Sequence, residues 1–337
     1  MIDPRLQTLR VLHEQGTVTA TAPVLHLTPS TVSQQLRQLS DRLGLELLEP
    51  AGRRVRLTPA ALALVEHADA LFLRWEKARA DLAGYADGMA GRLRITGVAT
   101  AITGVIAPAA ARLRAELPRL AVEIGEDPDT NRFELLLAGR ADIAVVIVAE
   151  GAPPADDARF RQHPVLQEPQ DLLVPAGHRF AGRAEQGVTL AEAAEESWIG
   201  AGDPADQHRL LLTACASAGF TPRVRHHAVD WSAVAALVAH GFGICLVPRL
   251  APLPERYPVV RVPLRGEHLP VRRFVAAVRR GSERQPPIAR GLVALCGAAG
   301  GSGAEGGVRK AGAEVSPAGP ARTRRRTSGR RCRCPWP

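Results

Sequence analysis

The stretch Leu25-His-Leu-Thr-Pro-Ser-Thr-Val-Ser-Gln-Gln-Leu36 decides the fold of the N-terminal part of the chain. Thr28 can cap a helix, and Pro29 suits the first helical position because its missing amide hydrogen leaves no hydrogen bond unmade there. Apolar residues then recur at spacings of four, three and four, which predicts one buried helix face: Val32, Leu36, Leu39 and Leu43. The other face is polar and carries Ser30, Thr31, Ser33, Gln34, Arg37 and Gln38.

The residues upstream predict two shorter helices. One apolar helix face precedes Gly16 and is formed by Leu6, Leu9, Val11 and Leu12. We expect Thr19 to cap a second helix that runs to about His26. A short helix, a three-residue turn and a capped helix with a polar outer face describe a helix-turn-helix, whose side chains can read base edges or hold phosphates. A small helical bundle with a solvated face fits the helix pair equally well.

The segment after these helices predicts a basic β-hairpin. Apolar residues and arginines alternate from Arg54 to Leu57, which is typical of a strand, and Gly52 can make the turn with Arg53 at its tip. Such a hairpin can straddle the DNA backbone as a wing, so it favours DNA binding over the plain bundle. The residues expected to contact DNA are Thr28, Ser30, Thr31, Ser33, Gln34, Arg37, Arg53, Arg54 and Arg56.

Residues 59–90 predict a long helix that pairs with a second copy of the chain. Apolar residues there alternate at spacings of four and three: Leu64, Ala68, Leu71, Trp75, Ala78, Leu82, Tyr85 and Met89. This regular seam is typical of a coiled-coil partner, although a helix packed on its own domain also fits. The expected dimerisation residues are Leu64, Leu71, Trp75 and Leu82.

From Leu93 to about Leu295 strands alternate with helices, which predicts α/β layers. A nearly all-apolar strand from Asp142 to Val148 suits the centre of a parallel sheet, and Arg273–Val278 is expected to cross back from a second half to the first. Two α/β halves imply a cleft at helix N-termini, where hydroxyls and backbone amides can bind a small anion. The effector-binding candidates, for which helix capping is the alternative role, are Thr100, Thr103, Thr130, Asp203, Trp231 and Ser232.

The charge of the chain suggests an acidic partner but lies mostly in one segment. The formal net charge is +9, and +7 of it falls in residues 298–337, a stretch rich in Gly, Pro, Ala and Arg that we expect to be disordered. Residues 1–58 carry only +2. The tail is interpreted either as an arm that adds phosphate contacts or as a dispensable extension.

Other protein classes find little support in the sequence. No apolar run approaches the ~18 residues of a membrane helix, no apolar signal core follows the N-terminus, and the five cysteines are scattered. We therefore expect a cytoplasmic protein without a disulfide framework or membrane partner. Gly200-Ala-Gly202 lacks the third glycine of a dinucleotide loop, and Cys332-Arg-Cys334 lacks a second zinc-ligand pair. We expect no enzyme activity, no cofactor and no bound metal.

The first sixty residues resemble the LysR-type transcriptional regulators. The resemblance lies in Thr17-Val-Thr-Ala-Thr-Ala22, Leu25 to Leu36, Leu43-Gly44 and Gly52-Arg-Arg-Val-Arg-Leu-Thr58. It continues more loosely through Leu137-Ala-Gly-Arg-Ala-Asp-Ile-Ala-Val-Val146 and Val238-Ala-His-Gly-Phe-Gly-Ile-Cys-Leu-Val-Pro248. Two prolines depart from the family pattern, Pro23 in the second helix and Pro50 before the wing.

The resemblance implies a multidomain chain. Residues 1–58 would form a winged helix-turn-helix, 59–90 a linker and dimerisation helix, and 91–297 an effector-binding domain of two α/β lobes, built like a periplasmic binding protein. The basic tail would follow at 298–337. The implied function is that of a sequence-specific regulator on double-stranded promoter or operator DNA, controlled by a small-molecule effector and acting as a homodimer or homotetramer. The alternative is a small-molecule-binding or catalytic α/β protein whose helical N-terminus does not bind DNA.

Overall fold

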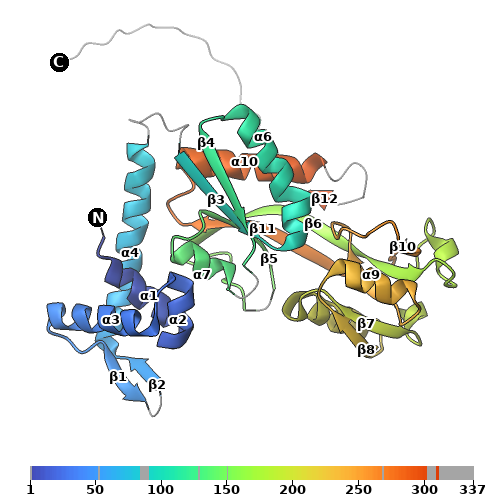
Figure 1. The fold of residues 1–337 in the computed structure, drawn as a ribbon, viewed down its shortest axis with the longest axis horizontal. Coiled ribbons are helices and arrows are strands. Elements are labelled where there is room, and N and C mark those ends of the chain that lie inside the picture. The colour runs from blue at the N-terminus through green and yellow to red at the C-terminus, as the bar shows by residue number, and fades with distance from the viewer. Residues whose placement is uncertain are drawn as a thin grey trace, which may run out of the picture.

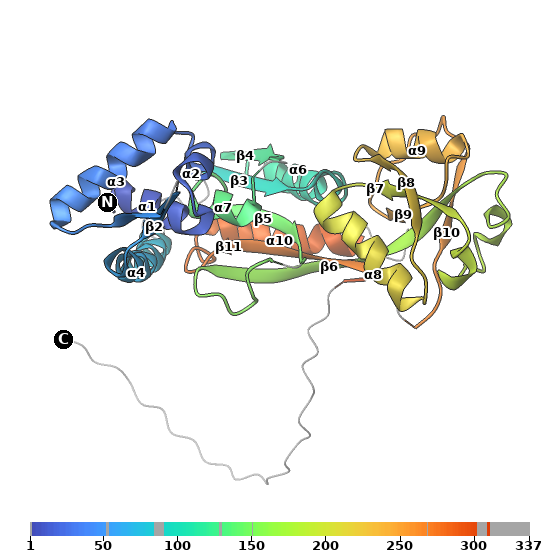
Figure 2. The same ribbon diagram turned by 90° about the horizontal axis from the view of Figure 1, so that it is seen from below.

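The computed structural model describes residues 2–51, 54–83, 91–127, 130–149, 151–267, 269–301 and 309–310 of the 337-residue chain. A helical head with a β-hairpin, a long helix and a two-lobed α/β domain follow one another in the sequence. Figures 1 and 2 show the head beside the first lobe, with the second lobe at the far end. Among the described residues, no helix is both long and apolar enough to cross a membrane.

The head contains three helices, α1 (Pro4–Gln15), α2 (Val18–Leu25) and α3 (Pro29–Leu43). Their apolar faces meet in a core that includes Leu9, Val32 and Leu36, each at most 1% exposed. Gly16 and Gly44 end α1 and α3 in the left-handed conformation, with φ of 68° and 65°, which glycine adopts without a steric penalty. The apolar spacing therefore predicted the packed face of α3 correctly at Val32, Leu36 and Leu39, whereas Leu43 in the last turn is 45% exposed.

The start of α2 differs from the expectation. Thr17, and not Thr19, is the N-cap: its backbone is extended, and the amide of Ala20 donates to its hydroxyl at 3.1 Å. Thr19 lies inside the first turn of the helix, so it cannot cap it. Pro23 is accommodated within α2, which ends two residues later at Leu25.

A β-hairpin follows the head as expected. Its strands β1 (Leu48–Ala51) and β2 (Arg54–Leu57) are antiparallel, whereas Gly52 and Arg53, the expected turn, lie outside the described residues. Thr58 links the hairpin to the long helix α4 (Pro59–Leu82), because its hydroxyl donates to the carbonyl of Glu46 at 2.8 Å and accepts from the amide of Ala61 at 3.1 Å. Residues 84–90, the expected end of this helix, lie outside the described residues.

Lobe I is a sheet with helices on both faces. Its elements are β3 (Gly91–Gly97), α5 (Ala99–Ala101), the π-helix η1 (Ile102–Ile106), α6 (Ala107–Glu116), β4 (Leu120–Gly125), α7 (Arg132–Leu137), β5 (Ile143–Ile147), β6 (Phe160–Pro175), β11 (Val271–Arg279) and α10 (Pro286–Gly301). The strand order is β4-β3-β5-β11-β6. Val145 of β5 packs in the core beneath α6 and α10, whereas Val146 packs on the opposite face with Phe133 of α7.

Lobe II is built on the second half of β6. Its elements are η2 (Ala181–Arg183), η3 (Ala191–Ala193), β7 (Ser197–Ala201), the π-helix η4 (Pro204–His208), α8 (Arg209–Ser217), β8 (Arg223–Ala228), α9 (Trp231–Ala239), β9 (Cys245–Pro248) and β10 (Val259–Pro263). Strands β9 and β10 pair with β6, and β7 is parallel to β8. The lobes are thus joined by β6, which leaves lobe I, and β11, which returns to it as expected.

Three features of the two-lobed domain and of the segment that follows it were not expected. Strand β6 is 16 residues long, although only Leu172 to Val174 suggested a strand. Helix α10 was not predicted, and it continues to Gly301, past the expected boundary at 297, because Ala298 and Ala299 are buried in the core of lobe I. Arg309–Lys310 forms the short strand β12 against β6. Residues 302–308 and 311–337 of the expected disordered tail lie outside the described residues.

Candidate functional site

Helix α3 presents the polar face that the sequence predicts. Ser30, Gln34 and Arg37 are exposed, while Thr31 and Ser33 are half-buried. The opposite face packs in the head, so the helix stands with its hydroxyl and amide groups toward solvent. This is the arrangement by which a recognition helix enters a major groove.

The N-terminus of α3 is fixed by its cap. Thr28 has an extended backbone, and its hydroxyl accepts from the amide of Thr31 at 3.2 Å. The same oxygen lies 2.8 Å from the hydroxyls of both Ser30 and Thr31, so three hydroxyls form one exposed cluster. On the inner side, Thr8 of α1 donates to Gln35 of α3 at 2.5 Å, which links α3 to α1 behind it.

The arginines of the wing, the hairpin formed by β1 and β2, lie at different positions along it. Arg56 pairs with Glu49 on the facing strand at 2.6 Å, and its side chain is 75% exposed. Arg54 opens strand β2 next to the turn, and Arg53 lies outside the described residues. Because an exposed ion pair contributes little stability, a phosphate can replace Glu49 as the partner of Arg56 at small cost.

Helix α4 carries an exposed apolar row. Leu71, Trp75 and Leu82 are 48%, 38% and 59% exposed. Leu64, the first residue of the expected seam, packs against the core of the head, and Ala68 is fully buried. Only the part of the seam from Leu71 onward is therefore available to another molecule.

The junction of the two lobes holds a buried ion pair. Glu168 on β6 is 0% exposed and accepts from Arg272 on β11 at 2.6 and 2.9 Å. Its other oxygen accepts from the amide of Leu250 at 2.6 Å, and Arg272 also donates to the hydroxyl of Thr100 at 3.0 Å. The pair thus joins both crossing strands to the start of α5 in lobe I and to lobe II.

A pocket of about 170 Å³ lies next to this pair, between the end of β5 in lobe I and helix α8 in lobe II. Its polar lining is Asp206, Arg209, Thr213 and Arg272, and the rest is apolar or small. Burial raises the pKa of the Asp206 carboxyl, and the charge of Asp203 adds to the effect. Three guanidinium groups act against it, those of Arg272, Arg132 and Arg209.

In each lobe a π-helix precedes the first long α-helix. Strand β3 is followed by η1 and α6, and strand β7 is followed by η4 and α8. π-Helices are rare and often occur at functional sites. Within η4, Gln207 is 2% exposed and donates to Gln170 at 2.7 Å, so this turn is fixed directly to the crossing strand β6.

The six expected effector residues fall in different environments. Thr100 is buried and reaches the pocket through Arg272, whereas the hydroxyl of Thr103 donates back to the carbonyl of Ala99 at 3.1 Å. The amide of Thr130 donates to Asp127 at 3.0 Å. In lobe II, Asp203 is exposed at the start of η4, Trp231 packs in a core cluster, and Ser232 accepts from Arg256 at 3.3 Å. None of the six is among the residues that line the pocket.

Sequence reasoning missed the residues that do form the junction: Glu168, Gln170, Asp206, Gln207, Arg209 and Arg272. One signal was present, since Gln167-Glu-Pro-Gln-Asp171 is a polar run between apolar residues that turn out to lie on one strand. Polar side chains on a buried strand need hydrogen-bond partners, and the other crossing strand can provide them.

The head, the exposed seam and the two-lobed domain together define a winged-helix DNA-binding regulator with a ligand-sensing domain. The sequence matches the family described as bacterial regulatory helix-turn-helix protein, lysR family, over residues 4–62, and the LysR substrate binding domain over residues 86–300. The chain therefore belongs to the LysR family of transcriptional regulators. The alternative of an α/β protein with a non-DNA-binding N-terminus is not favoured.

Curated relatives agree with this assignment. A hydrogen peroxide-inducible genes activator of Dickeya chrysanthemi is 27% identical over 74% of this chain and 80% of the relative. The HTH-type transcriptional regulator AlsR of Bacillus subtilis is 25% identical over 67% of this chain and 74% of the relative. Among solved structures, a full-length OxyR variant from Pseudomonas aeruginosa has a TM-score of 0.61 at 20% identity, covering 87% of this chain and 96% of that one.

Proposed function

We propose that this regulator reads its DNA site with the exposed face of α3 and grips the backbone with the wing. The observation that carries the proposal is the division of α3 into a face packed in the head and an exposed face of hydroxyl, amide and guanidinium groups. Ser30, Thr31, Ser33 and Gln34 are assigned to bases, with Thr28 as cap and phosphate ligand. Arg37, Arg53, Arg54 and Arg56 are assigned to phosphates.

The effector is assigned to the junction between the lobes. The pocket there brings a carboxyl with a raised pKa, Asp206, together with Arg209 and Arg272, so it suits a small polar ligand with hydrogen-bonding groups of both kinds. Of the six residues expected from the sequence, Thr100 has the strongest support because it bonds to Arg272. Ligand binding that favours one arrangement of the lobes would shift a pre-existing equilibrium.

Sensing is proposed not to depend on oxidation of Cys215 or Cys245. Some named relatives are peroxide-inducible activators, and peroxide reacts with thiolates rather than thiols. In this chain Cys215 and Cys245 are buried, and burial raises the pKa of both thiols to about 12. These two cysteines are therefore poorly suited to act as peroxide sensors.

The exposed row on α4 supports self-association. A second copy that covers Leu71, Trp75 and Leu82 would remove these apolar surfaces from water. Two heads related by symmetry would then engage two half-sites on the DNA. A regulator that acts in this way on chromosomal DNA works in the cytoplasm.

A mobility-shift assay tests the DNA-binding proposal. The full-length chain is titrated into a duplex selected from a random-sequence library, and into a scrambled duplex as control. Ser33→Ala is expected to reduce the preference for the selected duplex with little loss on the scrambled one, since Ser33 is assigned to a base. Equal binding of both duplexes by the unmodified protein would refute the assignment of α3. A thermal-shift screen of polar metabolites, repeated with Asp206→Asn, tests the effector pocket.

A further inference from the structure

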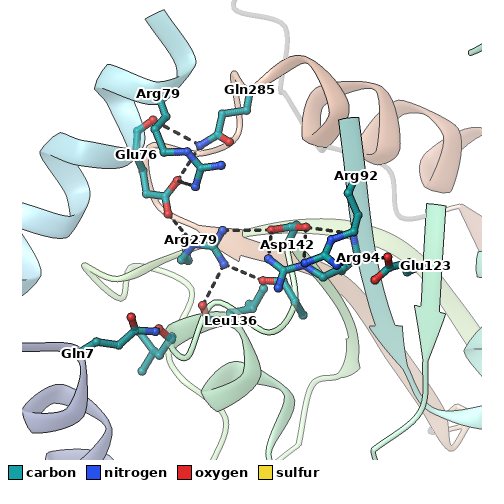
Figure 3. A network of polar contacts seen from close by, with 12 residues as sticks. Gln7, Glu76, Arg79, Arg92, Arg94, Glu123, Leu136, Asp142, Arg279 and Gln285 are labelled. Atoms are coloured by element: carbon teal, nitrogen blue, oxygen red, sulfur yellow. Dashed lines mark hydrogen bonds and ion pairs between the residues drawn. The ribbon is translucent and has the colours of Figure 1, made fainter. Parts of the chain in front are cut away.

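The linker helix is bound to lobe I of its own chain by a buried network of polar side chains. Glu76 on α4 is 4% exposed, and its carboxylate accepts from Arg279 at 2.7 Å and from Gln285 at 2.6 Å. These contacts join residues separated by 203 and 209 positions in the sequence. Figure 3 shows Glu76 reaching from α4 toward Arg279 at the end of β11.

Arg279 extends this network into lobe I. Its guanidinium donates to the carbonyls of Leu136 and Ala141 at 2.9 and 2.6 Å and lies 3.3 Å from Asp142. Asp142 is held in turn by Arg94 on β3, through its backbone amide at 3.0 Å and its guanidinium at 2.9 Å. Burial works to raise the pKa of Asp142, but these hydrogen bonds outweigh it and hold that pKa below the usual range.

The head itself contacts the same part of lobe I. Gln7 of α1 donates to the carbonyl of Leu137 at 3.1 Å, next to the carbonyl that Arg279 binds. Arg140 donates to the last carbonyls of α2, those of Pro23 and Val24, at 3.4 and 3.3 Å. Glu14 of α1 forms an ion pair with Arg159, which precedes β6. Figures 1 and 2 both show α2 beside α7.

The head and α4 are also fixed to each other. Arg10 of α1 is 5% exposed, pairs with Asp69 of α4 at 2.6 Å and stacks over the ring of Phe72 at 4.3 Å. Head, linker helix and lobe I therefore form a closed triangle of contacts. Movement of lobe I relative to the head must break at least one buried charged contact, which is costly.

We propose that Glu76 and Arg279 clamp the linker helix, and with it the DNA-binding head, to lobe I of the same chain, so that the orientation of the head follows lobe I. This inference rests on the proposed DNA-binding role of α3. Glu76 and Arg279 are positioning residues, since they touch neither the DNA-binding face nor the interlobe pocket. The spacing of two heads on DNA is then set by the position of lobe I in each subunit.

Two substitutions open the clamp from opposite sides. Glu76→Ala removes the carboxylate, while Arg279 keeps Asp142 and two carbonyls as partners and Gln285 keeps only the backbone carbonyl of residue 76, at 3.4 Å. Gly281→Ala acts from lobe I, because a Cβ there would lie 3.0 Å from the carbonyl of Leu73 on α4. Each has a matched control: Glu66→Ala removes an exposed carboxylate from α4, and Gly219→Ala has a φ of +85°, close to the +91° of Gly281, with nothing within 4 Å.

Hydrogen exchange of the full-length, DNA-free protein is the first measurement. Amides in the second half of α4 and in residues 279–285 should exchange at least about tenfold faster in Glu76→Ala and Gly281→Ala, with faster exchange in α1 and α2 as well. The two controls should match the unmodified protein. Unchanged exchange in α1 and α2 would overturn the proposal, since the head would then not depend on the clamp.

Binding to duplexes with two half-sites at varied spacing is the second measurement, with half-sites taken from the random-library selection. The unmodified protein should prefer one spacing by roughly tenfold, and the clamp variants by less than about threefold, while affinity for a single half-site is unchanged. Glu76→Gln, which keeps an acceptor for Arg279, should restore most of the preference. An undiminished spacing preference in both clamp variants would overturn the proposal. If the unmodified protein selects no half-site, the assignment of α3 fails, and the exchange result alone decides the clamp.

Discussion

Glu168→Gln should destabilise the effector-binding domain strongly. Glu168 is fully buried, and its two oxygens accept three hydrogen bonds, two from Arg272 and one from the amide of Leu250. The glutamine keeps one oxygen for Leu250 but places an amide nitrogen against the guanidinium. Removing one partner of a buried ion pair costs about 3–5 kcal/mol because the other charge stays buried without compensation.

The surroundings of Arg272 narrow the expected loss of unfolding free energy in Glu168→Gln. Arg272 keeps its hydrogen bond to the hydroxyl of Thr100 and lines the interlobe pocket together with Asp206, so part of the orphaned positive charge keeps polar neighbours. We therefore expect the lower end, about 3 kcal/mol. In a domain of this size each kcal/mol lowers the melting temperature by about 2–4 °C, which predicts a drop of roughly 6–12 °C.

Calorimetry and urea denaturation followed through the buried Trp198 measure this change. The matched control is the double variant Glu168→Gln with Arg272→Met, which removes both charges but keeps an acceptor for the amide of Leu250, and it should lie within about 1 kcal/mol of the unmodified protein. A loss below about 1 kcal/mol in Glu168→Gln would refute the reasoning. So would a double variant that is less stable than the single one.

Three further predictions concern the head, the linker and the thiols. Arg54→Ala should weaken binding to all duplexes about equally and lower the salt dependence by about one phosphate, measured by affinity across salt concentrations; an unchanged slope would contradict the wing assignment. Leu71→Glu should shift the protein toward monomer in analytical ultracentrifugation, whereas Glu66→Gln on the same helix should not, and equal behaviour of the two would exclude this face. With the other three cysteines replaced by serine, Cys215 and Cys245 should resist thiol labelling at pH 8, where only about one in 10⁴ would be thiolate, and react once urea unfolds the chain. Rapid labelling of the folded protein would contradict their burial.

Local patterns predicted the head almost completely. Helix α3 was predicted from its cap, its apolar spacing and its terminal glycine, all of which act within a few residues of one another. The error at α2 has the same origin, because Thr17 and Thr19 are both suitable caps and only the path of the backbone decides between them. The strand β11 and its return to lobe I were likewise expected, as a late strand over Arg273–Val278.

The sites that depend on distant partners could not be predicted in the same way. Glu168 and Arg272 are 104 residues apart, and their pairing follows from the register of two crossing strands. In its local sequence Glu76 is a polar residue beside a heptad seam, yet its partner, Arg279, is 203 positions away. The sequence indicated a cleft at helix N-termini and hence hydroxyl groups, whereas the charged residues that line the interlobe pocket are Asp206 of η4, Arg209 of α8 and Arg272 on the crossing strand β11.

The charges of the head limit how it can bind DNA. Residues 1–58 contain seven arginines, and within the described part of this segment four form ion pairs with acidic residues: Arg5 and Arg42 with Asp3, Arg10 with Asp69, and Arg56 with Glu49. Arg37, Arg53 and Arg54 are also assigned to phosphates, and Arg56 can exchange its exposed partner Glu49 for a phosphate. Four phosphate contacts predict a slope of log affinity against log salt near −3.6 per head, and about −7 for two heads.

A measured slope much steeper than this must come from elsewhere in the chain. Residues 311–337 carry seven arginines, enough to add several phosphate contacts per subunit. A slope steeper than roughly −10 that returns to about −7 when these residues are deleted would assign the tail an active role as an arm. A slope near −7 with or without them would assign recognition to the wing, the hydroxyl cluster at Thr28 and the pairing of two heads. In that case the specificity of the regulator depends mainly on the geometry that the clamp maintains, since few charges are left to supply affinity.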